Sequence, residues 1–185
     1  MKARRIFRLK ILNSFLFFIC SLGFASEFNP SLILNGKEIY LRGVGTRTST
    51  IFNIKVYTAG FYYSDKIKLP SLKEELLPFL FKLEFKRSVS VDKFQAALEE
   101  GLERNNYKKD DFKLELDKIK NYLSEFQEND ELIISYDGTL ISLKKGNADS
   151  AVEFTNKDFS YAIYSVWLGN PIQEKLKNDL LSIKK

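Results

Sequence analysis

Runs rich in β-branched and aromatic residues dominate the chain between residues 31 and 64. They predict strands over 32–34, 39–41, 51–57 and 61–63. Asn35-Gly36 separates the first two of these strands, and both positions can adopt positive φ at low cost, so a tight hairpin is expected there. A further strand is predicted over 79–86, where apolar and charged residues alternate and leave one face wet.

Two amphipathic helices are predicted next. The first starts after Ser90, and its apolar residues recur at helical spacing until Asn105-Asn106 offers a left-handed stop. In the second, Asp110 can cap the start. Its apolar face is formed by Phe112, Leu116, Ile119, Leu123 and Phe126. We therefore expect a helical pair packed by one apolar stripe.

The C-terminal third repeats the order of strands followed by helices. Strands are predicted over 131–136 and 139–143, joined at Asp137-Gly138 as a hairpin, and a short one over 150–154. A helix opens at 155–158, runs through Trp167 and closes at Gly169-Asn170, and Pro171 starts a last one. This order predicts an α+β fold, because it lacks the alternation of a doubly wound parallel sheet, and no internal repeat is found.

Length and composition favour one folded domain. The chain has 185 residues, of which 44% are hydrophobic, enough for one well-buried core and too few for two. With 16 Phe and 9 Tyr against 4 Pro and 9 Gly, the chain is too rich in bulky apolar side chains to be a disordered linker protein.

The formal net charge of +5 comes entirely from the first ten residues. The basic residues there are Lys2, Arg4, Arg5, Arg8 and Lys10. Without these five, 29 basic residues become 24, which equals the 24 acidic residues. A balanced remainder does not favour a nucleic-acid partner, and none is expected.

The basic head precedes an apolar run of fourteen residues, 11–24, and the small-residue end Gly23-Phe24-Ala25. This is the order of a secretory signal peptide. We predict a signal peptide over 1–25, a mature domain over 26–185, and export to the periplasm or cell envelope. The run is shorter than the ~20 residues of a membrane-spanning helix, so no permanent anchor is expected. Cys20 as a lipidated cysteine is the alternative, although Ile19 stands where Gly, Ala or Ser is usual.

Beyond residue 25 the chain contains neither cysteine nor histidine. This excludes a disulfide framework, a Cys or His nucleophile system, a Ser-His-Asp triad and the usual zinc sites from the predicted mature chain. We expect no metal and no cofactor. A general base would have to be Asp, Glu, Lys or Tyr.

The stretch 41–48 contains Gly43-Val44-Gly45, but a phosphate loop is not favoured, because no third glycine stands at the required place and no helix follows. Together with 52–62, the stretch resembles the N-terminal signature of the chalcone isomerase-like superfamily. In that signature a glycine-flanked arginine precedes a strand reading roughly Lys-Val-Tyr-x-x-Gly-x-Tyr, found here over 55–62. The resemblance continues at 89–94, 101–102, 137–138 and 165–169, and covers nearly all of residues 32–182.

The resemblance implies an open-faced β-sandwich, an antiparallel sheet covered by a layer of helices, with a ligand cleft between them. Plant enzymes of this superfamily cyclise chalcones, whereas non-enzymatic relatives bind fatty acids. By position, Arg47 looks like the arginine that holds the ligand's anionic oxygen. Tyr57 stands where isomerases have a threonine and agrees better with the fatty-acid-binding relatives. Tyr107 lies close to an active-site tyrosine, and Val166 stands near a Ser or Thr of the isomerases.

These observations predict an exported, non-catalytic binding protein for a fatty acid or similar amphipathic carboxylate, with Arg47, Tyr57 and Tyr107 as ligand-binding candidates. One alternative is an isomerase or lyase for a phenolic or enone substrate, in which Arg47 stabilises an oxyanion. Another is an envelope interaction module whose cleft is filled by its own side chains. From the residues alone, Arg47 can equally reach water or pair with an acid, and the tyrosines can be half-buried or surface residues. Trp167 is predicted to lie in the core.

Overall fold

The computed structural model describes residues 28–49, 52–65, 75–146 and 148–182; the predicted signal peptide lies outside them. The strands are β1 Ser31–Leu34, β2 Lys37–Thr48, β3 Lys55–Tyr63, β4 Phe79–Phe85, β5 Glu131–Tyr136, β6 Ile141–Lys145 and β7 Val152–Phe154. They form one seven-stranded sheet in sequence order, with every neighbouring pair antiparallel. The helices are α1 Val91–Arg104, α2 Lys113–Tyr122, α3 Lys157–Leu168 and α4 Glu174–Leu180, and a 3₁₀ turn, Lys109–Phe112, precedes α2.

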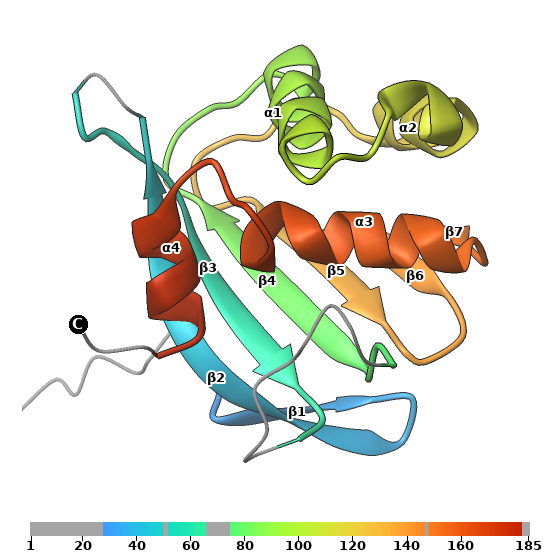
Figure 1. Ribbon diagram of the computed structural model, residues 1–185. Coiled ribbons are helices and arrows are strands. Elements are labelled where there is room, and N and C mark those ends of the chain that lie inside the picture. The colour runs from blue at the N-terminus through green and yellow to red at the C-terminus, as the bar shows by residue number, and fades with distance from the viewer. Residues whose placement is uncertain (1–27, 50–51, 66–74, 147, 183–185) are drawn as a thin grey trace, which may run out of the picture.

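Helices α1, α2 and α3 lie over one face of the curled sheet, and α4 packs along β2 (Figure 1). This arrangement confirms the predicted α+β class and the antiparallel sheet covered by helices. The Asn35-Gly36 hairpin is also confirmed, since both residues have positive φ, 47° and 76°.

The second and third strands differ from the sequence prediction. Strand β2 continues through Gly43 and Gly45 to Thr48, and β3 starts at Lys55 instead of residue 51 and runs unbroken through 58–60. Glycine weakens a strand locally. Here pairing with β3 holds the backbone extended, with register shifts near Arg42 and after Arg47.

The hairpin at Asp137-Gly138 is confirmed, but its predicted two-residue turn is wrong. Tyr136 pairs with Ile141, so the loop has four residues, 137–140. The Asp137 carboxylate accepts hydrogen bonds from the backbone N–H groups of Thr139 and Leu140, at 2.8 and 3.0 Å. Such an Asx turn offers the backbone an alternative to the tighter hairpin.

Helix α1 starts and stops as predicted: the Ser90 hydroxyl accepts from the Lys93 N–H, and Asn106 has a φ of 63°. The second helix is shorter than expected. It ends at Tyr122 because the chain turns extended, and Phe126 then forms a β-bridge with Val89. The last helix begins at Glu174 and not at Pro171.

The main core lies between the helices and the inner face of the sheet. Its sheet side consists of buried aromatic and aliphatic residues at alternate positions, among them Phe61, Phe79, Phe81, Leu83, Ile134 and Leu143. A smaller cluster of Phe28, Ile39, Tyr62 and Leu80 covers part of the outer face. None of the helices in the described ranges combines the length and the apolar composition that a membrane-spanning segment requires.

Candidate ligand-binding site

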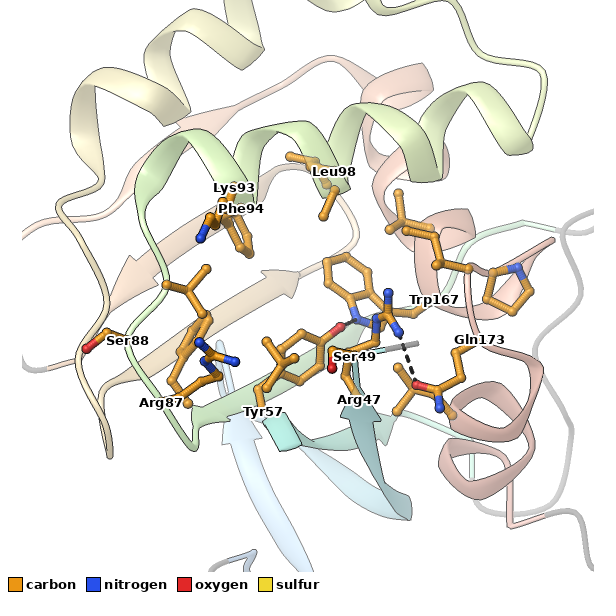
Figure 2. Close-up of a pocket in the computed structure, with 18 residues that line it drawn as sticks. Arg47, Ser49, Tyr57, Arg87, Ser88, Lys93, Phe94, Leu98, Trp167 and Gln173 are labelled. Carbon is orange, nitrogen blue, oxygen red and sulfur yellow. Dashed lines mark hydrogen bonds between the residues drawn. The ribbon is translucent and has the colours of Figure 1, made fainter. Parts of the chain in front are cut away.

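A cavity of about 350 Å³ lies between the sheet and the helices (Figure 2). It is bounded by β2, β3 and β4, by α1, by the end of α3 and by the segment that leads into α4. Most of its wall is apolar, with Phe85, Phe94, Leu98, Val166, Trp167 and Ile172. The polar side chains on the wall include Arg47, Tyr57, Arg87, Lys93 and Gln173. A mostly apolar hollow with a few convergent polar groups is the usual form of a small-molecule site.

The sheet register brings Arg47 and Tyr57 together. Arg47 on β2 is paired with Tyr57 on β3, which is paired in turn with Phe85 on β4. Directly opposite residues share one face of a sheet. Tyr57 packs against the main core beneath the helices, and both side chains line the cavity.

Gln173 fixes the arginine from the start of α4. Arg47 Nη1 donates to Gln173 Oε1 at 3.3 Å and to the Thr48 carbonyl at 2.5 Å. The same Gln173 oxygen accepts from the Thr48 N–H at 3.1 Å, and Gln173 Nε2 donates to Thr48 Oγ1 at 3.0 Å. These partners are all neutral, and no carboxylate of the described residues forms an ion pair with Arg47. Within the described residues, the guanidinium is therefore held in place by neutral groups alone.

Trp167 orients the Tyr57 hydroxyl. The indole N–H donates to Tyr57 Oη at 3.0 Å. Because an indole nitrogen only donates, the tyrosine oxygen is the acceptor and its own proton is left for another partner. Burial raises the pKa of Tyr57, while the Trp167 hydrogen bond and the charge of Arg47 act in the opposite direction. The phenol is thus neutral at pH 7 and can donate.

Two more cations stand at the rim of the cavity. Arg87 follows β4, Lys93 lies in the first turn of α1, and both are exposed. No acidic residue is among the described residues that line the cavity. The wall thus combines three cations with apolar surface, which favours an anionic, amphipathic ligand.

Tyr107 is not brought to this site. It is half-buried beyond the end of α1, where its ring centroid lies 6.0 Å from that of Phe112, and it does not line the cavity. Burial raises its pKa, and the nearby Asp158 and Tyr161 add to the effect. A ligand-binding role for Tyr107 stays a prediction that this cavity does not support.

Val166 does line the cavity, but it also fills a close helix contact. A Cβ added at Gly101 of α1 would lie 2.6 Å from Val166 Cγ1.

Sequence analysis did not identify Gln173, Arg87 or Lys93, and it assigned Trp167 to the core alone. Trp167 is indeed 4% exposed, yet its N–H reaches the site. No group of three or more His, Cys, Asp or Glu residues in the described part of the chain is arranged to hold a metal ion.

Comparison with known proteins gives a family and a fold. A sequence profile described as chalcone isomerase-like matches residues 24–182. The crystal structure of a fatty-acid-binding protein from Arabidopsis thaliana superposes with a TM-score of 0.59. The two are 16% identical, and the match covers 82% of this chain and 95% of that one. No curated protein matches. At this identity, the structural match shows the fold alone.

Proposed function

Since the chain belongs to the chalcone isomerase-like family, we propose that it is a non-catalytic binding protein for a fatty acid or a similar amphipathic carboxylate. The observation that carries the proposal is the pair of Arg47 and Tyr57. They lie side by side on β2 and β3 and line an apolar cavity whose described lining residues include no acid. The name of the Arabidopsis protein, which has this fold, also supports it.

The pair suits a carboxylate for reasons of charge and geometry. A guanidinium fork donates to both oxygens of a carboxylate, and such charge-assisted bonds are about twice as strong as neutral ones. The Tyr57 hydroxyl, with its oxygen occupied by Trp167, adds a neutral donor. Taking up a carboxylate would pair a half-buried arginine whose hydrogen-bond partners among the described residues are all neutral.

The volume of the cavity bears on the length of the ligand. A volume of about 350 Å³ is near the lower end of the range for ligand pockets, about 300–1,000 Å³. Allowing about 30 Å³ for each group of water or methylene size, it holds roughly a dozen such groups. We therefore propose a medium-chain acid of about ten to twelve carbons, or a longer one whose tail leaves the cavity. A cavity that the described side chains leave open also favours this proposal over an interaction module whose own side chains fill the cleft.

The proposal predicts that Arg47→Ala weakens binding of decanoate far more than binding of decanol. A charge-assisted bond contributes about 1.5–3 kcal/mol, or roughly 10- to 150-fold in affinity, whereas the contribution of the apolar tail survives the substitution. Tyr57→Phe removes one neutral bond and is expected to cost less, about 0.5–1.5 kcal/mol. Titration calorimetry with the acid and the alcohol measures both effects.

Arg104→Ala is the matched control, because Arg104 is an exposed arginine at the far end of α1 that does not line the cavity. It should leave both affinities unchanged. If Arg47→Ala affected the acid and the alcohol equally, Arg47 would support the fold and not the ligand, and the proposal would fail.

Export to the periplasm or cell envelope is also proposed, with cleavage after Ala25. It rests on the basic head, the apolar run and the small-residue end of residues 1–25. N-terminal sequencing of the protein recovered from the envelope fraction is expected to begin at Ser26. A start at Met1, or at a lipid-modified Cys20, would contradict it.

A further inference from the structure

Beyond a single carboxylate, we propose that the cavity takes a ligand with an anionic group at each end. One group lies at Arg47 and Tyr57, and the other lies at the rim, between Arg87 and Lys93. The inference deepens the proposed function and rests on it. It names the ligand class as an amphipathic dianion, a chain with a carboxylate at one end and a carboxylate or phosphate at the other.

The rim cations lie away from the arginine on β2. Figure 2 shows Arg87 and Lys93 on the opposite side of Tyr57 from Arg47. The register Arg47–Tyr57–Phe85 places β2 and β4 two strand spacings apart, about 10 Å, and Arg87 follows Phe85 by two residues. An extended chain of about ten carbons covers such a distance, given C–C bonds of about 1.5 Å.

The wall between the two cationic positions is apolar and aromatic. The rings of Tyr57 and Phe85 meet edge to face, with centroids 5.9 Å apart, and Phe94 packs against Phe85 at 6.4 Å. Both phenylalanines are buried and line the cavity. A methylene chain would contact this wall, while its two ends would reach charged groups.

The acids nearest in sequence to the rim cations are bound to other lysines. Glu84 pairs with Lys86 at 2.5 Å, and Asp92 pairs with Lys120 at 2.9 Å. In the part of the chain that the structure describes, no ion pair includes Arg87 or Lys93. Among the described residues, two like charges without an ion-pair partner therefore line the same cavity.

Because the rim is exposed to solvent, a second anionic group of the ligand loses little hydration there. A carboxylate buried in the apolar part of the cavity would lose its hydration, which is costly. At the exposed side chains of Arg87 and Lys93 it would keep part of its water and gain two opposite charges. A methyl end placed there would gain nothing from either cation, so the rim distinguishes dianions from simple fatty acids.

The test compares decanedioate with decanoate by titration calorimetry, on the intact protein and on the double variant Arg87→Gln/Lys93→Gln. We expect the double variant to lose about tenfold in affinity for decanedioate, since two exposed charge pairs are removed, and less than about twofold for decanoate. A second ligand of this class, 10-phosphonodecanoate, tests whether a phosphonate, standing in for a phosphate, is accepted as one of the two anionic groups. The control Arg104→Gln/Lys108→Gln removes two exposed charges of the same sign outside the cavity lining and should leave all three ligands unaffected.

The outcomes separate this inference from the proposed function. If Arg47→Ala weakened neither decanoate nor decanedioate, the proposed function itself would fail. If Arg47→Ala weakened both, but the rim variant weakened decanoate as much as the dianions, the rim would only attract anions in general and the present inference would be overturned. Weaker binding of both dianions than of decanoate by the unmodified protein would overturn it as well. Because Arg87 and Lys93 are exposed, their replacement should leave the thermal unfolding midpoint unchanged, and Arg87→Lys should retain most of the preference for a dianion.

Discussion

Trp167 illustrates how one side chain can belong to both the core and the site. Its ring packs 5.1 Å from that of Phe81, centroid to centroid, while its N–H holds the oxygen of Tyr57. Sequence periodicity identified the apolar role because the residue lies on the inner side of a helix. It could not identify the polar role, since the partner is 110 positions away in the chain and only the packing of α3 on β3 brings the two together.

We predict that Trp167→Phe raises the pKa of Tyr57 further. The hydrogen bond from the Trp167 indole stabilises the ionised phenol, and the substitution removes that bond. The same change should weaken decanoate binding by about 0.5–1.5 kcal/mol, as the hydroxyl loses its fixed orientation. Tyrosine-labelled NMR measures the pKa, and calorimetry measures the affinity. In a Tyr57→Phe background the substitution should cost little further affinity; an equal loss in both backgrounds would show that Trp167 acts only through packing.

The candidate ligand-binding site could be predicted only in part from sequence. Arg47 and Tyr57 were found through a resemblance, and the register confirms that they are neighbours. Gln173 could not be found, because a lone glutamine before a helix carries no sequence signal. The rim cations were also missed, since exposed Arg and Lys residues occur on every soluble surface.

At the scale of elements, local sequence patterns predicted the middle of each helix and strand, whereas tertiary contacts determine where several of them begin and end. Strand β2 continues past its predicted end because it pairs with β3, and Gly43 and Gly45 let α4 approach this extension. A Cβ at Gly43 would collide with the backbone oxygen of Asp179, and one at Gly45 would lie 2.8 Å from Leu176 Cδ1. The two glycines that looked like a weak phosphate loop are thus needed for helix packing.

The packing of α4 on β2 also affects the candidate ligand-binding site. Helix α4 starts one residue after Gln173, so the contact of α4 with β2 also sets the position of the amide that binds Arg47 and Thr48. The shorter α4 and the shorter α2 have a common reason: residues that the sequence pattern places in a helix make tertiary contacts instead. Phe126 pairs with Val89, and Gln173 pairs through its side chain with Thr48.

At the scale of the molecule, the sheet is covered unequally on its two faces. The helices cover the inner face, whereas a small cluster around Tyr62 covers part of the outer one. The Tyr62 hydroxyl is buried without a hydrogen-bond partner among the described residues, and burial raises its pKa to about 12. A composition rich in aromatic residues predicted one large core; it did not predict that some tyrosines would be buried with unsatisfied hydroxyls.

This burial predicts a loss of stability in alkali. Below pH 10, the ordinary pKa of tyrosine, Tyr62 is neutral in both the folded and the unfolded chain, so its contribution is fully present. Above that pH the unfolded chain ionises first, and the free energy of unfolding falls until the folded pKa of about 12 is passed. For Tyr62 alone the loss is on the order of 1 kcal/mol at about pH 11.

Urea unfolding at about pH 8 and about pH 11 measures this effect. The free energy of unfolding should fall more steeply between these pH values in the unmodified protein than in Tyr62→Phe. Tyr62→Phe should be at least as stable as the unmodified protein at about pH 8, because it removes a buried hydroxyl that has no partner among the described residues. Its free energy of unfolding should still fall somewhat as the pH rises, because burial also raises the pKa values of Tyr57 and Tyr164. Parallel declines in the two proteins would show that Tyr62 ionises equally easily in the folded and the unfolded chain.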